Sequence, residues 1–255
     1  MKYLKLFENF SMSHIREICE YYDITDYSIN PDGSIDVIGN VNFSNGRLTE
    51  IPIKFNKVDG NFNFSNNRLT TLEGCPKEVS GYFNVFKNSL TTLEGCPKYI
   101  GSHFSCNHNN LTSLENGPKF VGETFNCSNN NIKSLKGFET ILNGSFVISN
   151  NNLESLVDCP NIRGSLHIQE NKLTTLEGLP EVHKGILCFG NPIYEIFSLF
   201  YNDIKIYLDY QETYNFVRKD CRVVKYLLEE VIKDYNEYYN KSVELPKKII
   251  GYTYI

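Results

Sequence analysis

Apolar residues recur along the chain with a period of about 21 residues. Each unit carries one aligned leucine or isoleucine, with apolar residues seven and five positions before it and another three positions after it. Because the two earlier apolar positions alternate with a mostly polar one, they predict a short strand with one face turned inward. The aligned residues are Leu48, Leu69, Leu90, Leu111, Ile132, Leu153, Leu173 and Ile193.

A period of this length predicts a solenoid. A unit of about 20 residues cannot bury its own apolar side, so neighbouring units must stack to form one continuous core. The stacked strands predict a parallel β-sheet on the concave side, and triplets such as Gly74-Cys75-Pro76 predict an extended, irregular convex side. A glycine recurs with the same period, at Gly39, Gly60, Gly81, Gly101, Gly122, Gly144, Gly164 and Gly185.

An asparagine stands two residues before the aligned position in seven successive units. The backbone turns inward there, so its amide and carbonyl groups leave the strand ladder without partners. Since asparagine carries both donors and an acceptor, it can bond groups of two adjacent turns, and the column predicts an internal asparagine ladder. The column is Asn67, Asn88, Asn109, Asn130, Asn151, Asn171 and Asn191, and Gly46 takes its place in the first unit.

The chain divides into an N-terminal cap at 1–38, a solenoid of about eight repeats at 39–196 and a C-terminal helical cap at 197–255. Caps are expected because an uncovered terminal unit exposes an apolar cross-section and an open strand edge. The first cap is predicted to hold a helix from Ser13 to about Tyr22, followed by a strand.

The strand of the first cap is predicted around Ile35 and Val37. The C-terminal cap is predicted to contain helices at 203–217 and 221–239 and an extended tail from Pro246. This cap is rich in tyrosine, a residue enriched at protein interfaces, so it offers an alternative surface for a partner.

The aligned columns resemble leucine-rich repeats in their short bacterial form of about 20 residues. The resemblance covers residues 39–196. The run from Leu69 to Pro76 is similar to repeats of bacterial effector proteins and of proteins carried by large tailed bacteriophages, and the chain's opening and ending, Met1–Phe10 and Pro246–Ile255, are similar to those of the phage proteins. The resemblance implies a leucine-rich-repeat solenoid and a phage origin.

Composition narrows the classes of function. The net charge is -5, and basic residues are scattered, which argues against a nucleic-acid partner. No apolar run is long enough to span a bilayer, and Met1–Phe10 lacks the features of a signal peptide, so we expect no membrane partner and a cytoplasmic protein. No phosphate-binding glycine loop, HExxH motif or CxxC pair occurs, so we expect no cofactor and no metal.

Most of the eight cysteines occupy apolar positions of the repeat. Cys75, Cys96, Cys106, Cys127, Cys159 and Cys188 alternate with phenylalanine, valine, isoleucine or leucine in other units. His103 and His108 lie near Cys106 in the sequence, but Cys106 belongs to an inward column. A cysteine–histidine nucleophile is therefore not expected, and the protein is predicted not to be an enzyme.

The outward positions of the concave sheet are the candidate binding surface. Most are short Asn and Ser side chains, whereas binding energy concentrates in aromatic and arginine anchors. Tyr82, Phe86, His103 and His108 form the best candidate contact cluster. The alternative interpretation is that the polar columns serve only to keep the sheet soluble. The full predicted surface comprises Tyr82, Asn84, Phe86, His103, Ser105, Asn107, His108, Asn126, His167, Gln169, Leu187 and Phe189.

These features favour a non-enzymatic protein–protein interaction module, a monomer or weak oligomer, that binds a host or immune factor through its concave face. Three alternatives stay open. The chain is a virion or assembly component, with Met1–Phe10 as an address peptide; or an effector resembling ubiquitin ligases, with Cys221 as nucleophile; or a trap for a small ligand on the asparagine-lined face.

Overall fold

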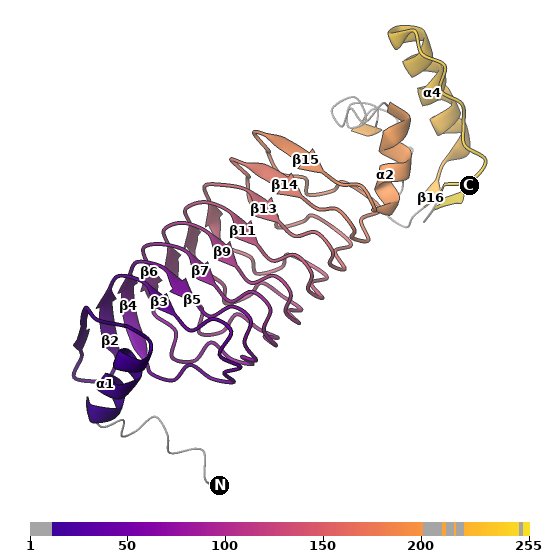
Figure 1. Ribbon diagram of the computed structural model, residues 1–255. Helices are drawn as coiled ribbons and strands as arrows, with labels where there is room; N and C mark the ends of the chain where they lie inside the picture. Colours follow the sequence, from indigo (N-terminus) through magenta and orange to yellow (C-terminus); the bar gives the residue numbers. More distant parts are fainter. Residues whose placement is uncertain (1–11, 201–210, 213–216, 218–221, 250–251) are drawn as a thin grey trace.

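The computed structural model describes residues 12–200, 211–212, 217, 222–249 and 252–255 (Figure 1). From the first strands to β15, the chain winds into an elongated parallel-strand β-solenoid, and its turns stack along one axis. This confirms the solenoid predicted from the period of about 21 residues.

The predicted sheet is present as eight short parallel strands. Phe83 lies opposite Phe104 and Phe104 opposite Phe125, so each strand pairs with its equivalent one turn away. The strands are β3 (Val41–Asn42), β5 (Phe62–Asn63), β7 (Phe83–Asn84), β9 (Phe104–Ser105), β11 (Phe125–Asn126), β13 (Phe146–Val147), β14 (Ser165–His167) and β15 (Gly185–Leu187).

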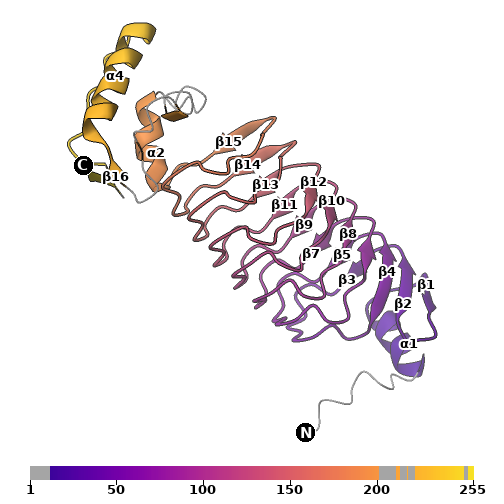
Figure 2. The ribbon, with the colours of Figure 1, turned by 180° about the vertical axis from the view of Figure 1, so that it is seen from behind.

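A second sheet of seven strands follows the side of the solenoid that was predicted to be irregular (Figure 2). Its strands are β1 (Tyr27–Ile29), β2 (Ile35–Ile38), β4 (Phe55–Asp59), β6 (Glu78–Val79), β8 (Tyr99–Ile100), β10 (Phe120–Val121) and β12 (Ile141–Leu142). Only β1 pairs antiparallel, with β2. The prediction of extended backbone here is right, but the prediction of irregular structure is wrong, because neighbouring turns hydrogen-bond to each other.

Aromatic rings stack along the core from turn to turn. The first residue of each strand from β3 to β13 in the eight-stranded sheet points inward, and the rings of Phe62, Phe83, Phe104, Phe125 and Phe146 are fully buried. Successive centroids in this column lie 4.7–5.7 Å apart. Burying each ring contributes about 2–3 kcal/mol, and only the neighbouring turns provide the apolar surroundings.

Glycine occupies the corner between the two sheets. A Cβ atom at Gly101 would lie 2.0 Å from the carbonyl oxygen of Ser80, and one at Gly122 would lie 2.0 Å from that of Gly101. Gly81 stands one residue later in its own turn than Gly101 does. Its amide donates to the carbonyl oxygen of Gly60 at 2.8 Å. From Gly39 to Gly164, glycine therefore stands at either of two consecutive corner positions. This explains the gap of 20 residues before Gly101 and the gap of 22 before Gly144, whereas the gap of 20 before Gly164 reflects a turn that is itself 20 residues long.

The asparagine ladder is confirmed. Asn67 Nδ2 donates to the carbonyl oxygens of Phe43, one turn back, at 2.8 Å and of Phe64 at 3.1 Å. Its Oδ1 accepts from the Leu48 amide at 2.9 Å. Asn88, Asn109, Asn130, Asn151 and Asn171 make the equivalent bonds in their own turns, so the ladder ties each turn to the one before it.

The seven-stranded sheet ends at β12 because the following turn is one residue shorter. Three positions separate Pro97 from the inward Ile100, but only two separate Pro160 from the inward Ile162. Ile162 forms an isolated parallel bridge to Val182 and, among the described residues, no ladder joins β12 to Ile162. A surface hollow of about 540 Å³ opens here.

The N-terminal segment places a helix against the first turn, as predicted. Helix α1 (Met12–Tyr21) buries Ile15 and Cys19 in the core. The ring of Tyr22 lies 4.3 Å from that of Phe43, centroid to centroid.

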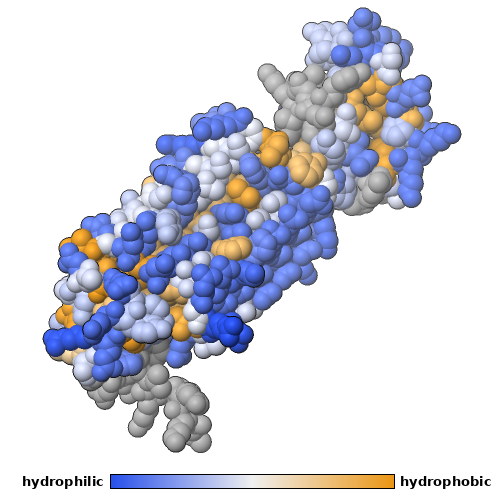
Figure 3. All heavy atoms as spheres, viewed as in Figure 1, coloured by the Kyte–Doolittle hydropathy of each residue, from blue (hydrophilic) through white to orange (hydrophobic). Residues whose placement is uncertain are grey.

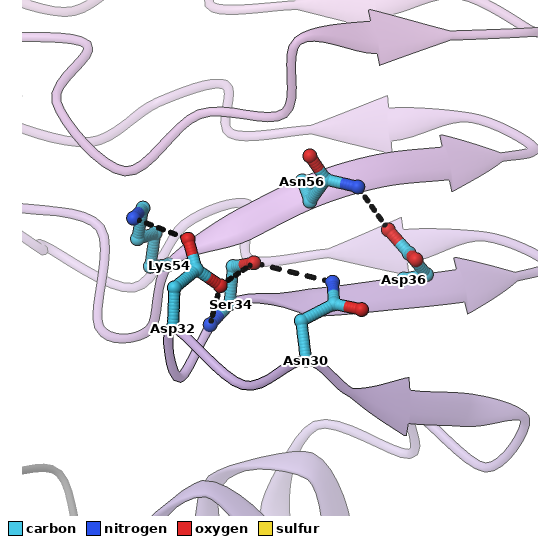
Figure 4. A network of polar contacts seen from close by, with 6 residues as sticks. All are labelled: Asn30, Asp32, Ser34, Asp36, Lys54 and Asn56. Carbon is cyan, nitrogen blue, oxygen red and sulfur yellow. Dashed lines mark hydrogen bonds and ion pairs between the residues drawn. The ribbon is translucent and has the colours of Figure 1, made fainter.

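A polar network lies over the turn between β1 and β2 (Figure 4). The Asp32 carboxylate accepts from Lys54 Nζ at 2.8 Å and from the Ser34 amide at 3.1 Å. Asn30 Nδ2 donates to Ser34 Oγ at 3.2 Å. These bonds fasten the turn to β4.

The C-terminal segment contains α2 (Pro192–Phe197), the 3-10 helix η1 (Ser198–Phe200) and α4 (Lys225–Tyr239). The predicted helix at 221–239 is confirmed from residue 225, whereas most of the predicted helix at 203–217 lies outside the described residues. The tail pairs β17 (Thr253–Tyr254) in parallel with β16 (Arg222–Val223).

Candidate functional site

The outward positions of the eight-stranded sheet form one continuous face. Asn84 lies opposite Ser105, and Ser105 lies opposite Asn126. Further along, His167 lies opposite Leu187. The second outward column holds Phe86, Asn107, Gln169 and Phe189, two residues further along each strand. The nine predicted residues of these two columns therefore share this face, as expected.

Most asparagines on this face are engaged in local bonds. Asn84 Oδ1 accepts from the Phe86 amide at 3.0 Å. Asn126 Oδ1 accepts from the Ser128 amide at 3.0 Å and from its hydroxyl at 2.8 Å. Because the side-chain oxygens already accept hydrogen bonds from backbone amides at the strand exit, these asparagines offer a partner mainly their side-chain amide hydrogens. Their first role is structural.

Phe86 and His108 form an aromatic pair on neighbouring turns. Their ring centroids lie 5.1 Å apart at an interplanar angle of 80°. His108 stands at a left-handed backbone position, with φ of 55°, and Asn107 Nδ2 lies 3.2 Å from its Nδ1. The left-handed turn carries the exposed imidazole against the half-buried Phe86 ring and creates an aromatic site at the strand exit.

Tyr82 and His103 lie at the other end of the strands, beside the glycine corner. His103 Nε2 is 2.6 Å from Glu123 Oε2, and its Nδ1 accepts from the Thr124 amide at 3.3 Å. This pattern fits the tautomer with hydrogen on Nε2. Glu123 was not among the predicted residues, because its position relative to His103 depends on turn-to-turn register.

The predicted four-residue cluster is therefore two separate groups, a correction to the sequence analysis. Four residues of extended chain separate Tyr82 from Phe86, a span of about 13 Å. The Tyr82 amide donates to Asn61 Oδ1 at 2.9 Å, at the corner. Phe86 and His108 share one site at the strand exit, whereas Tyr82 and His103 border another.

A second apolar group lies at the C-terminal end of the same face. Leu187 and Phe189 are 45% and 48% exposed. Five turns separate Phe189 from Phe86, which corresponds to about 24 Å at the usual strand spacing. The face thus presents two apolar ends with a mostly polar stretch between them, in which Val147 lies between Asn126 and His167.

Buried cysteines offer no accessible nucleophile on this face. Cys106 is fully buried, and burial raises the pKa of its thiol well above the ordinary value. It is turned inward, while His103 and His108 are exposed, as the inward column predicted. Cys221 lies outside the described residues. In the part of the chain that the structure describes, no cluster of three or more histidine, cysteine or acidic side chains could hold a metal ion.

The seven-stranded sheet carries an apolar stripe that the sequence analysis missed. Tyr99 and Phe120 stack with centroids 5.1 Å apart and planes within 6°. Ile141 lies opposite Phe120 on the next strand and is 64% exposed. The signal in the sequence is three apolar residues, Tyr99, Phe120 and Ile141, at intervals of 21 residues. Only the second sheet shows that these residues lie side by side and point outward.

Hydrophobic surface is otherwise scattered: Figure 3 shows small hydrophobic areas on a largely hydrophilic face. Within the described residues, no helix is both long and apolar enough to cross a membrane.

No protein-family model matches the chain, and no curated protein or solved structure matches it significantly.

Proposed function

We propose that the protein is a non-enzymatic protein-binding module whose partner lies across the outer face of the eight-stranded sheet. The observation that carries this proposal is the presence of two apolar groups on that face, one with half-buried Phe86 and one with exposed Leu187 and Phe189. Phe86 with His108, and Leu187 with Phe189, interrupt columns of otherwise small polar residues without adding to the core. Such groups are the usual anchors of an interface.

The partner is a protein surface at least about 24 Å long, since it must reach both apolar groups. The polar stretch between them supplies amide hydrogens and His167, which suits a hydrated contact with few charges. The stretch carries no exposed lysine or arginine in its two outward columns, so it does not suit a phosphate-rich partner.

The repeats are proposed to be leucine-rich repeats of the short bacterial type, with helical caps at both ends. Support comes from the recurrent apolar columns and from the asparagine ladder. The resemblance to repeat proteins of large tailed bacteriophages extends the proposal to a phage-encoded protein that acts on a host or immune factor in the host cytoplasm.

The test is affinity purification of the tagged protein from bacterial cells, quantified by mass spectrometry. In a double variant, Phe86→Ala with Phe189→Ala, the amount of the specifically co-purified protein should fall by at least about tenfold. A matched control, Val157→Ala with Tyr238→Ala, changes two exposed apolar residues away from this face and should retain it. Equal retention by both double variants would contradict the proposed binding face.

A further inference from the structure

The apolar stripe on the seven-stranded sheet lies at the centre of a longer outward column. Hydrogen-bonded register places Lys57, Glu78, Tyr99, Phe120 and Ile141 on five successive turns. The next two turns carry Asn161 and Glu181, which are joined by a bond from the Glu181 amide to Asn161 Oδ1 at 3.2 Å. Phe120 is the midpoint of these seven positions, and Asp36 extends the column by one further turn beyond Lys57.

Charges on the two sides of Phe120 are complementary. Lys57 lies three turns before Phe120, and Glu181 lies three turns after it. Glu78 lies two turns before, and Arg163, two residues after Asn161, lies two turns after. A two-fold axis along the strand direction at Phe120 would therefore bring Lys57 opposite Glu181, and Glu78 opposite the turn that carries Asn161 and Arg163.

From this symmetry we propose that two copies of the chain pair face to face through their seven-stranded sheets. Phe120 faces Phe120 of the second copy, and Tyr99 faces Ile141. Lys57 then faces Glu181, and Glu78 faces Asn161, with Arg163 about 7 Å further along the strand direction. An isologous contact of this kind closes on itself and forms a dimer rather than a fibre.

Existing ion pairs on this face do not prevent the contact. Lys57 Nζ lies 3.8 Å from Glu78 Oε2, and His183 Nε2 lies 3.4 Å from Glu181 Oε1. All four side chains are more than half exposed, so these pairs contribute little and can exchange partners. Arg163 makes no ion pair with any residue that the structure describes.

Lys119 lies close to the proposed axis, where it would approach Lys119 of the second copy. Its charge is compensated by an ion pair with Glu139 in the same chain. The Lys119–Glu139 pairs of the two copies bring equal numbers of positive and negative charges to the centre. Lys98, beside Tyr99, donates to the carbonyl oxygens of Asn116 and Gly117 in its own chain.

The expected dimer is weak. Six turn spacings of about 4.8 Å give the column a length of about 29 Å, and a stripe two or three residues wide buries only a few hundred Å² per copy. Stable complexes bury about 800 Å² per partner, so a micromolar or weaker dissociation constant is expected. Because the eight-stranded sheet lies outside the contact, the proposed partner-binding face of each copy stays accessible in the dimer.

Sedimentation velocity of the full chain from micromolar to near-millimolar concentration tests the proposal. The wild type should shift from monomer to dimer. Ile141→Glu should raise the dissociation constant at least about tenfold, because an exposed apolar residue at the centre becomes charged. Leu187→Glu, an equally drastic change on the other sheet, should leave it unchanged.

Charge reversal separates this contact from general stickiness. Arg163→Glu should weaken the dimer, and Arg163→Glu with Glu78→Arg should restore it to near the wild-type level. A chain that stays monomeric at the highest concentration, a double reversal that fails to restore pairing, or a dimer lost through Leu187→Glu but not Ile141→Glu would each overturn the proposal. None of these outcomes depends on binding by the eight-stranded face.

Discussion

Asparagine is required in the ladder because of its reach as well as its polarity. Asn109 lies at the inward turn, where its Nδ2 donates to the carbonyl oxygens of Val85 and Cys106, both at 3.0 Å. Its Oδ1 accepts from the Leu90 amide at 3.0 Å. One short side chain thus satisfies backbone groups of two turns, which explains why the column was legible in the sequence from residue type alone.

Replacing Asn109 by alanine is expected to destabilise the protein by about 2–4 kcal/mol, because three buried backbone groups lose a partner. Asn110→Ala is the matched control, since Asn110 is exposed and should change stability by less than about 0.5 kcal/mol. Urea unfolding of the two variants measures the difference. Equal midpoints would show that the ladder bonds are not needed.

Glycine at the sheet corner has a different reason, the close approach of neighbouring turns. Gly122→Ala should destabilise the protein by about 2–3 kcal/mol, because the added methyl group meets the Gly101 carbonyl oxygen and the backbone must shift. Gly185→Ala is a fair control from the same periodic series: nothing lies within 4 Å of its Cβ position. Thermal unfolding should show a lowered midpoint for Gly122→Ala alone.

Elements differed in how readily the sequence revealed them. Three alternating positions, such as Phe83, Asn84 and Val85, were enough to predict the strands of the first sheet. In strands of the second sheet such as β8, a single inward residue, Ile100, is followed directly by the glycine corner, so no alternation appears. Their pairing comes from the register of adjacent turns, which the first sheet already imposes.

Helix α2 was missed because its spacing also fits the repeat. Ile193 and Ile196 continue the two leucine columns, and both are buried as predicted. A separation of three residues suits one face of a helix as well as one side of a solenoid turn. The candidate site shows the same limit: His103 and His108 are near in sequence, but a strand places them at opposite ends.

The turn between β1 and β2 gives a pH prediction. The hydrogen bond and charge of Lys54 hold the pKa of Asp32 well below its usual value, with further help from Ser34. A lowered pKa in the folded state stabilises the protein above the unfolded value of about 3.9, and this contribution is lost as the pH falls further. Asp32→Asn should therefore reduce stability at neutral pH.

The difference between Asp32→Asn and the wild type should shrink progressively below about pH 4, where the Asp32 carboxylate of the unfolded chain begins to be protonated while that of the folded chain stays ionised. Urea unfolding at a series of pH values measures it. Glu94→Gln changes an exposed acid on a distant loop and serves as the control. A difference that stays constant down to the lowest accessible pH would contradict the proposed ion pair.

At the scale of the whole molecule, stability is a sum of turns and of contacts between neighbours. No described turn of the solenoid closes its own core, and each Phe ring contacts the rings before and after it. Residues can therefore be removed from such a chain without loss of the fold only as whole turns. Two faces remain outside the core, and the proposals assign one to a partner and the other to a second copy.

Removing one whole turn should therefore leave a folded protein. Deleting residues 61–81 joins Gly60 to Tyr82, which occupies the corner position that Asn61 held. The strands, the ladder and the glycine corner stay in register, so we expect cooperative unfolding at a moderately lower urea midpoint and a smaller m-value, because less surface is exposed. Deleting residues 61–70 removes half a turn and puts Leu72 and Gly74 at the inward strand positions of Phe62 and Phe64. That variant should not fold cooperatively, because its columns no longer align. Circular dichroism during urea unfolding distinguishes the two, and similar cooperative transitions in both would mean that register does not govern this fold.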